Sequence, residues 1–245
     1  MKMEMVETKQ PRPLWETQGE EKRIAVQDLF SRIAKNYDFV NHVLSFNRDQ
    51  KWRHLAASKL QLKSGDAVLD VCCGTGDFLS ALRSRVGVSG KVVGIDFCAP
   101  MLAQASNKDE NSLLVLGDAC QLPLANENFE GVSVGWGIRN VPDIDLAHRE
   151  IFRVLKPGGR FVSLDCAEPQ NNLVRKVTGI GRTFMTKLLG ASFRSRQEYD
   201  YLNESSKRFK SRQELVEIMQ KAGFVDVKFQ DLMFGNICIH WGTKP

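Results

Sequence analysis

Residues 67–78 read Ala-Val-Leu-Asp-Val-Cys-Cys-Gly-Thr-Gly-Asp-Phe. An apolar run that ends in an acid is followed by a Gly-x-Gly turn, and the residues from Asp77 to Val86 then follow a helical pattern. This order is typical of the first strand, turn and helix of a nucleotide-binding α/β sheet. The stretch therefore predicts an α/β fold with a ligand at the Gly-x-Gly turn.

The residues after the turn favour one kind of nucleotide. A turn that binds pyrophosphate needs a third glycine and an uncharged helix start, because the phosphate lies on the free N–H groups of the first helical turn. Here the third position is Leu79, and Asp77 puts a carboxylate where the phosphates would lie. Two like charges ~4 Å apart repel by on the order of 4 kcal/mol at an effective dielectric constant near 20. We expect Asp70 and Asp77 to attract a cationic ligand instead, such as S-adenosylmethionine, which carries a sulfonium and an ammonium group but no phosphate.

The composition fits one α/β domain. The chain has 245 residues, 42% of them hydrophobic and 26% charged, and no Pro/Ser/Gly-rich joint divides it. A net charge of +5 does not require a nucleic-acid partner. The six cysteines include no C-x-x-C pair, so we expect free thiols in a reducing compartment and no metal site. No apolar run approaches the ~20 residues of a membrane span, which predicts a cytoplasmic protein, soluble or peripheral to the inner face of the membrane.

Four segments follow from the local composition. Residues 1–22 lack an apolar core and predict a disordered tail. We expect residues 23–245 to form a single domain. Within it, residues 23–62 carry two helical patterns rich in aromatic side chains, which predict either a lid over the ligand or a cap on the sheet edge. Residues 166–210 are an insertion that we expect to face the substrate or a membrane.

Acids at the ends of the next two strands are candidate ligand contacts. Residues 91–96 (KVVGID) predict a second strand, and Asp96 at its end can accept both ribose hydroxyls or cap the following helix. Residues 113–117 predict a third strand. Asp118 follows it and can take the adenine amino group, while the N–H group of Ala119 contacts a ring nitrogen.

The turn after the fourth strand is the predicted site of the transferred methyl group. Residues 131–136 form that strand, and residues 137–142 (GIRNVP) follow it. Open α/β sheets bind ligands just outside the carboxyl ends of their strands. Arg139 and Asn140 offer hydrogen-bond donors there, and the alternative for Arg139 is a salt bridge to an acid of the lid.

The remaining elements complete the sheet. A helix that ends in a Pro/Gly turn leads into a fifth strand, and a helix with a capping box precedes two strands that predict an antiparallel hairpin. A nicotinamide enzyme would usually need a further catalytic domain. The predicted ranges are 145–155 (helix), 156–159 (turn), 160–165 (strand), 211–223 (helix), and 224–229 and 236–241 (hairpin).

Residues 171–197 are basic and amphipathic. They contain six Lys and Arg residues and no acid, interleaved with apolar side chains. Such a helix can lie on an anionic membrane surface, where each cation contributes roughly 1 kcal/mol. Two alternatives stay open: a solvated face over an ordinary core helix, and a homodimer contact.

With these residues placed, the chain from about Ala25 to its end resembles the ubiquinone/menaquinone biosynthesis C-methyltransferase family. The Tyr-Asp-x-x-Asn start of residues 37–52 is similar to the first family signature, and residues 153–165 (RVLKPGG to Asp165) are similar to the second. Residues 135–140 (GWGIRN) are similar to the turn after the fourth strand of the family. Residues 199–202 and 208–209 are similar to a later segment.

The resemblance implies a Rossmann-like class I S-adenosylmethionine-dependent methyltransferase: a seven-stranded, mostly parallel sheet with a C-terminal antiparallel hairpin and an N-terminal helical lid. It implies C-methylation of a prenylated quinol in respiratory quinone biosynthesis, with demethylmenaquinol as the first expectation and a demethoxy-ubiquinol-type benzoquinol as the alternative. It also implies Thr75, Asp96, Asp118 and Ala119 as donor contacts. The full set of expected donor contacts is Asp70, Gly74, Thr75, Gly76, Asp96, Asp118 and Ala119.

The chain departs from the two signatures at a few positions. Val40 and Asp49 stand where the family usually has Met and His. Asp165 and Ala167 stand where it usually has Glu and Ser, and Gly135 replaces a Ser that contacts the donor in some members. Both kinds of quinol therefore stay open at this stage.

The chemistry assigns roles to a few side chains. The acceptor carbon must be electron-rich, so the reduced hydroquinone can react and the quinone cannot. Arg139, with Asn140, is the candidate for stabilising a phenolate, because a guanidinium keeps its charge at any relevant pH. The expected base is Tyr37, Asp38 or His240, or water alone.

Two other classes of function compete with this interpretation. An RNA or DNA base methyltransferase often has an Asn-Pro-Pro-aromatic turn after the fourth strand to hold a flipped base. This chain has Gly-Ile-Arg-Asn there, which favours a chain without a nucleic-acid partner. A non-catalytic subunit that binds the donor would bind it without turnover.

Overall fold

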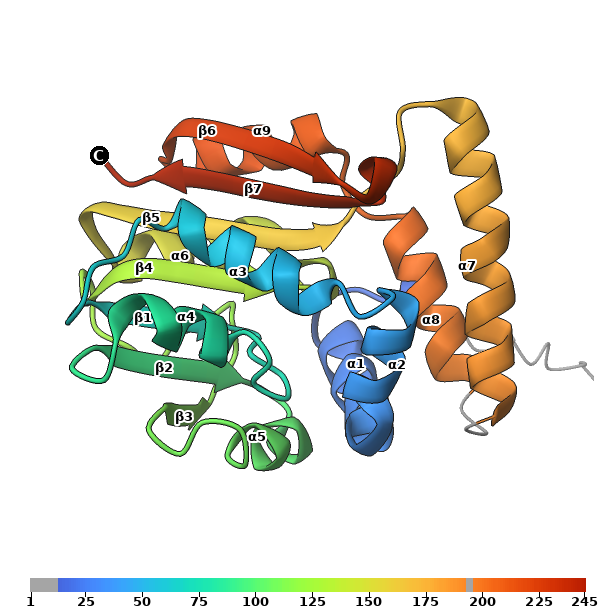
Figure 1. Cartoon of the computed structure of the whole chain (residues 1–245), viewed down its shortest axis with the longest axis horizontal. Helices are drawn as coiled ribbons and strands as arrows, with labels where there is room; N and C mark the ends of the chain where they lie inside the picture. The colour runs from blue at the N-terminus through green and yellow to red at the C-terminus, as the bar shows by residue number, and fades with distance from the viewer. Residues whose placement is uncertain (1–12, 193–195) are drawn as a thin grey trace, which may run out of the picture.

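Strands and helices alternate along most of the chain, and the seven strands form one sheet. In the computed structural model, which describes residues 13–192 and 196–245, the strand order is β3-β2-β1-β4-β5-β7-β6. Strands β1 to β5 are parallel, and β7 is antiparallel to both β5 and β6 (Figure 1). This confirms the predicted fold class. The strands are β1 (Ala67–Val71), β2 (Lys91–Asp96), β3 (Leu113–Leu116), β4 (Phe129–Gly135), β5 (Leu155–Cys166), β6 (Val225–Leu232) and β7 (Ile237–Thr243).

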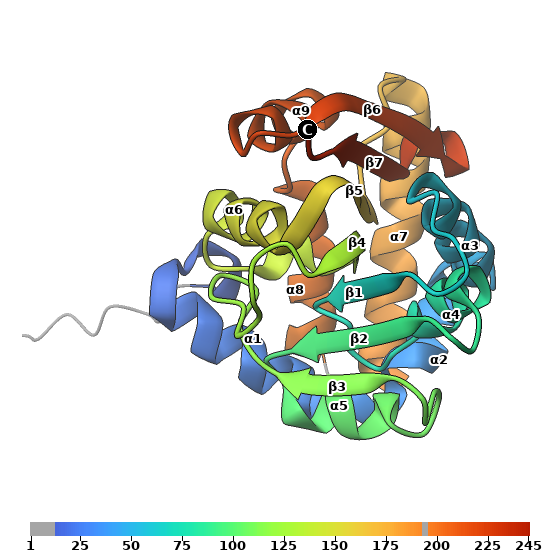
Figure 2. The same ribbon diagram turned by 90° about the vertical axis from the view of Figure 1, so that its left-hand side faces the viewer.

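Helices cover both faces of the sheet (Figure 2). On one face, α3 (Asp49–Lys59) and α4 (Leu79–Val86) bury apolar side chains against β1, β2 and β5. On the other face, α6 (Ile144–Val154) and α9 (Arg212–Lys221) do the same. The short helix α5 (Ala99–Ala105) lies beside β3.

A second group of helices stands beyond the carboxyl ends of the parallel strands (Figure 1). It consists of α1 (Gly19–Ile33), α2 (Tyr37–Leu44), α7 (Asn172–Ser192) and α8 (Arg196–Lys207). Helix α1 packs on α5 around Tyr201 of α8, and α7 contacts α8 and α2. The group therefore encloses the edge at which open α/β sheets bind ligands. Short 3-10 helices cover Leu14–Glu16, Ala34–Asn36, Ile138–Asn140 and Met233–Gly235.

The N-terminal part differs from the sequence prediction in two ways. Part of the predicted tail is helical, since α1 begins at Gly19 and the Lys22 ammonium donates to the carbonyl of Val141 at 2.8 Å. Residues 1–12 lie outside the described residues. Of the predicted lid, only α1 and α2 stand over the carboxyl edge. The last helix of that range, α3, packs on the sheet instead, because Trp52, Ala56 and Ala57 form a buried apolar face.

The Pro/Gly turn after α6 is not a separate loop. Strand β5 begins at Leu155, directly after the helix, and includes residues 156–159. Its pairing with β4 shifts between Phe129 and Gly131, and Gly158 has a φ of +77°. A bulge at the start of the strand therefore takes up the residues that the sequence pattern assigned to a turn.

The turn after β1 depends on two glycines with different surroundings. Gly76 has a φ of +83°, and a Cβ built there would lie 2.9 Å from the Cβ of Ala105. Gly74 has a φ of +55°, but no atom lies within 4 Å of its hypothetical Cβ.

We expect Gly74→Ala to lower the free energy of unfolding by about 1 kcal/mol, from backbone strain alone. Gly76→Ala should cost more, about 2 to 4 kcal/mol, because overpacking adds to the strain. Urea denaturation of both variants measures the difference. Equal losses would contradict the packing of α5 against this turn.

Candidate active site

One cavity lies at the carboxyl edge of the sheet, between the strand ends and helix α1. We call it the Asp96 cavity. It collects the ends of β1, β2, β3 and β4, and it brings together six residues that the sequence analysis singled out for the donor or for catalysis. Its lining includes Phe30, Tyr37, Cys72, Gly74, Asp96, Met101, Gly117, Asp118, Ala119, Gly135, Trp136, Gly137 and Asn140.

Asp96 is the buried acid of this cavity. Its carboxylate accepts hydrogen bonds from the backbone N–H groups of Gly74 at 2.8 Å and Cys98 at 2.9 Å. Burial raises the pKa of Asp96 to about 6, although these hydrogen bonds oppose the shift. Each oxygen keeps a second lone pair, so the carboxylate can still accept two further hydroxyl groups.

The adjacent turn presents the second predicted acid. Asp118 accepts the N–H group of Cys120 at 2.8 Å through one oxygen, and Ala119 beside it is almost fully buried. Both residues line the same cavity as Asp96. A nucleoside with its ribose at Asp96 would therefore extend its base toward Asp118 and Ala119.

Asp70, Thr75 and Gly76 are not among the lining residues of the Asp96 cavity. Asp70 is buried in β1, where the Ser133 hydroxyl donates to it at 2.6 Å, and burial raises its pKa to about 7. The Thr75 hydroxyl donates to the carboxylate of Asp38 on α2. Asp70 and Thr75 therefore bond to protein groups around the turn after β1.

The expectation that Asp77 attracts a cationic ligand is wrong. Its carboxylate is ion-paired with Lys108 on one side and lies 3.4 Å from the Arg53 guanidinium on the other. Two cations of this chain therefore already neutralise it, and neither could be recognised as a partner from the sequence. The sequence feature that still disfavours pyrophosphate at this turn is Leu79 in place of the third glycine.

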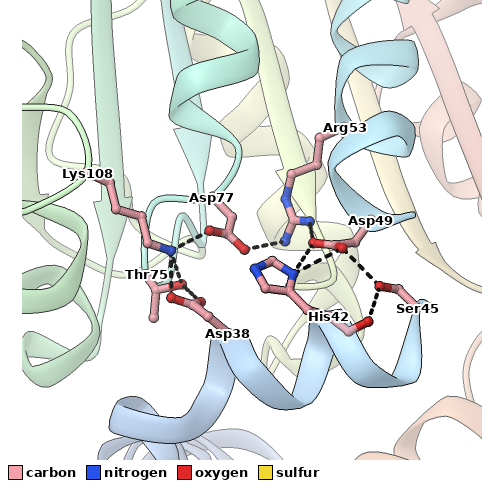
Figure 3. A network of polar contacts seen from close by, with 8 residues as sticks. All are labelled: Asp38, His42, Ser45, Asp49, Arg53, Thr75, Asp77 and Lys108. Carbon is pink, nitrogen blue, oxygen red and sulfur yellow. Dashed lines mark hydrogen bonds and ion pairs between the residues drawn. The ribbon is translucent and has the colours of Figure 1, made fainter. Parts of the chain in front are cut away.

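Asp77 belongs to a polar network that joins α2 to the core (Figure 3). Lys108 bridges Asp77 and Asp38, at 2.7 Å from the latter. Arg53 on α3 binds the buried carboxylate of Asp49 at 2.7 Å. Burial opposes ionisation of Asp49, but the charge of Arg53 and two side-chain hydrogen bonds leave its pKa below the ordinary value.

The same network contains three potential metal ligands. Ligand atoms of His42, Asp49 and Asp77 lie within 4.8 Å of one another. The Arg53 guanidinium contacts both carboxylates, however, and its positive charge disfavours a second cation there. The cluster is better described as a set of ion pairs that fixes α2 and α3.

A second, larger cavity adjoins the first. We call it the Arg139 cavity. It has a volume of about 370 Å³ and is mostly apolar, with Arg139 and Asp49 as its charged side chains. Among the described residues, Trp136 is the one that lines both cavities. The apolar side chains that line the Arg139 cavity also include Val43, Leu44, Phe46, Trp52, Met185, Leu202, Met233 and Ile237.

The side chain of Arg139 is buried and forms an ion pair with Asp165 of β5. The sequence analysis had considered a salt bridge to an acid of the lid instead. The Nη1 of Arg139 donates to Asp165 at 2.6 Å and to the carbonyl of Trp136 at 2.7 Å. Burial alone would lower the pKa of Arg139, but the Asp165 carboxylate outweighs burial and raises it. In the part of the chain that the structure describes, the buried Nε of Arg139 has no hydrogen-bond partner. One donor of the guanidinium is therefore uncommitted, although protein atoms enclose it.

The structure separates the three candidate bases. His240 is buried in β7 near the carbonyl of Arg212, and burial lowers its pKa to about 4. It lines neither cavity. Asp38 is committed to Lys108 and Thr75. Tyr37 lines the Asp96 cavity, but burial raises its pKa, so the hydroxyl keeps its proton at neutral pH.

Several residues of the site escaped the sequence analysis. Trp136 was included only as part of the GWGIRN segment, and Arg53, Asp49 and Lys108 were not assigned a site role. Tyr201 was included only as part of residues 199–202, and its hydroxyl donates to the side-chain oxygen of Asn140 at 3.1 Å. The positive φ of Trp136 and the pairing of distant charges cannot be read from local spacing.

The fold and the Asp96 cavity together define a class I S-adenosylmethionine-dependent methyltransferase. The sheet order with its antiparallel last strand, a buried acid at the end of β2 and an acid after β3 fit an adenosyl ligand. A S-adenosylmethionine-dependent methyltransferase of Thermotoga maritima has this fold, with a TM-score of 0.62 at 20% identity over 89% of this chain and 99% of that one.

The family follows from the sequence comparisons. Residues 16–244 match the model of the ubiE/COQ5 methyltransferase family, and the chain belongs to that family. It is 41% identical over 226 residues to a demethylmenaquinone methyltransferase of Lactiplantibacillus plantarum, covering 89% of this chain and 95% of that protein. It is 36% identical to the protein of the same name from Desulfitobacterium hafniense, covering 95% and 94%. S-adenosylmethionine is therefore the methyl donor.

The Asp96 assignment can be tested by donor binding. Hydrogen bonds to a charged group contribute about 1.5 to 3 kcal/mol, so Asp96→Ala should weaken S-adenosylmethionine binding at least about tenfold in calorimetry. In the wild type, affinity should fall as the pH drops below about 6, because the carboxyl then binds a proton. Asp96→Asn, which keeps the shape of the side chain, should lose this pH dependence. Unchanged affinity in Asp96→Ala would refute the ribose contact.

Proposed function

We propose that this protein transfers a methyl group from S-adenosylmethionine to a ring carbon of a prenylated quinol, with demethylmenaquinol as the substrate. The names of its relatives support the naphthoquinol over the benzoquinol. The observation that carries the proposal is the apolar Arg139 cavity beside the Asp96 cavity. Its size suits a bicyclic ring, and its one buried guanidinium suits a phenolic oxygen.

The residues of the two cavities divide the work of the reaction. When bound, the donor supplies a methyl group on a positively charged sulfur. The acceptor carbon has to lie about 3 to 3.5 Å from that methyl group, and correct placement alone lowers the barrier by ~7 to 11 kcal/mol. Trp136 lines both cavities, so this is where the two substrates meet. Asp96, Asp118 and Ala119 hold the nucleoside, and the walls of the Arg139 cavity hold the ring.

Arg139 makes the ring carbon nucleophilic. A phenolic oxygen that loses its proton pushes electron density onto the adjacent ring carbons, and a guanidinium stabilises the resulting phenolate. Arg139 lines the cavity with a guanidinium that stays charged, and it cannot itself act as a base at neutral pH. With Tyr37 protonated, we assign both proton removals, from the phenol and then from the methylated carbon, to water in the cavity.

We expect Arg139→Ala to bind the donor with unchanged affinity and to lower kcat by about 10²- to 10³-fold, the usual loss for one charge-stabilising donor. The substitution leaves Asp165 buried and unpaired, which should destabilise the fold by about 3 to 5 kcal/mol. Steady-state kinetics with a reduced demethylated naphthoquinol measure the first effect, and thermal denaturation measures the second.

The double variant Arg139→Ala with Asp165→Asn is the matched control. It removes the unpaired charge, so most of the stability should return while the rate stays low. A rate that recovers together with stability would show that Arg139 has only a structural role.

We further propose that α7 places the enzyme on the cytoplasmic face of an anionic membrane. No helix within the described residues has the length and apolarity needed to cross a bilayer. Leu173, Val177, Ile180 and Phe184 follow one face of α7 and are 61% to 72% exposed. The spacing of four, three and four residues gives one continuous apolar stripe. Exposed lysines of the same helix accompany it, which fits a helix lying in the interface.

The lysines of α7 provide a test. Lys176→Gln with Lys187→Gln should lower partition onto phosphatidylglycerol vesicles about 30-fold, because each cation contributes about 1 kcal/mol. Binding to phosphatidylcholine vesicles should change little. Lys221→Gln with Lys228→Gln, two exposed cations away from α7, is the control and should bind like the wild type.

Sedimentation velocity of the α7 variants distinguishes the remaining alternative. If the substitutions dissociate a homodimer and leave vesicle binding unchanged, the stripe is a contact between two copies of the chain and the membrane proposal is wrong.

A further inference from the structure

Trp136 has an unusual backbone for its position. It follows β4 directly, and its φ is +56°, a left-handed conformation that is rare for a bulky residue. Its N–H group donates to the carbonyl of Leu164 at 2.7 Å. Its own carbonyl accepts hydrogen bonds from Arg139 at 2.7 Å and from Asn140 at 3.3 Å. Such a conformation persists only where the surroundings fix it, and it is concentrated at functional sites.

The indole of Trp136 is fixed as firmly as its backbone. The Arg53 guanidinium lies 4.6 Å from the ring centroid, and the ring of Trp52 lies 6.5 Å away at 45°. Arg53 cannot move freely, because it is paired with Asp49 and Asp77 in the network of Figure 3. The ring therefore forms a rigid wall between the Asp96 cavity and the Arg139 cavity.

The reaction needs such a wall because a quinol has two kinds of nucleophile. Its phenolic oxygen and the ring carbon next to the oxygen-bearing carbon are both electron-rich, and they lie only two bonds apart. Transfer to carbon forms a carbon–carbon bond, after which the carbon loses its proton. Transfer to oxygen forms a methyl ether, and the oxygen loses its proton. In both cases the bond between the methyl group and sulfur breaks, so only the placement of the ring selects the product.

We propose that Trp136 is the positioning residue that directs methyl transfer to carbon rather than oxygen. Its indole stacks on the acceptor ring and fixes the plane of that ring, as offset aromatic pairs do. Its carbonyl holds the side chain of Arg139, which binds the phenolic oxygen away from the methyl group. One residue thus sets both the tilt of the ring and the position of its oxygen. The proposal rests on the proposed function.

The test compares Trp136→Leu with Trp136→Phe, using a reduced demethylated naphthoquinol as acceptor. Trp136→Leu keeps an apolar side chain without a flat face. It should raise KM for the acceptor at least tenfold and yield a detectable methyl ether beside the C-methylated product. Trp136→Phe should restore most of the KM and the carbon product. The two products separate chemically, because the C-methylated quinol reoxidises to a quinone in air and the ether does not.

A purely structural role predicts a different result: both variants lose stability and rate together, with the C-methylated product alone. That outcome overturns the proposal. If Trp136→Leu does not fold, Arg53→Lys takes its place, because it keeps the charge but loses the planar contact with the indole. It should raise KM for the acceptor at least threefold, and an unchanged KM and product overturns the proposal. Failure of the wild type to methylate the quinol would instead refute the proposed function.

Discussion

The site depends on buried acids at the carboxyl edge of the sheet, each compensated in a different way. Asp70 on β1 is bonded to the Ser133 hydroxyl, and its pKa is raised to about 7. Asp96 on β2 is held by two backbone N–H groups. Asp165 on β5 is paired with Arg139. The acid with only backbone partners keeps capacity for neutral hydroxyls, whereas the acid with a cation fixes a positive charge. Donor and acceptor sites therefore arise from one feature, a row of strand-end carboxylates with unequal partners.

Ion pairs and a hydrogen bond fix α2 and α3 to the turn after β1. Asp38 of α2 contacts Lys108 and Thr75, and Arg53 of α3 contacts Asp77. These pairs span the turn after β1, so a movement of α2 changes the surroundings of that turn. Phe30 of α1 and Tyr37 of α2 stand in the wall of the Asp96 cavity, so the positions of these two helices set the shape of the donor site.

Local sequence signals predicted the strands and helix caps well, but they predicted the ion pairs between distant residues poorly. Residues 91–96 form β2 with the predicted bounds, and the capping box of Ser211 and Glu214 is present as expected. Both signals are contained within a few neighbouring residues. The charge of Asp77 was misjudged because its partners, Lys108 and Arg53, are more than 20 residues away on either side. The methyl donor was nevertheless predicted correctly, because the missing third glycine already argues against a pyrophosphate at this turn without help from Asp77.

The two cavities also explain why a hydrophobic acceptor and a water-soluble donor can share one enzyme. The Arg139 cavity reaches the surface at Phe46, whose side chain is 70% exposed, and it is lined by Gly181 and Met185 of α7. The Asp96 cavity is lined by strand ends and by residues of α1 and α2, and none of the described side chains of α7 lines it. A prenyl tail can therefore stay along α7 while the ring reaches Trp136, and the donor can exchange on the other side.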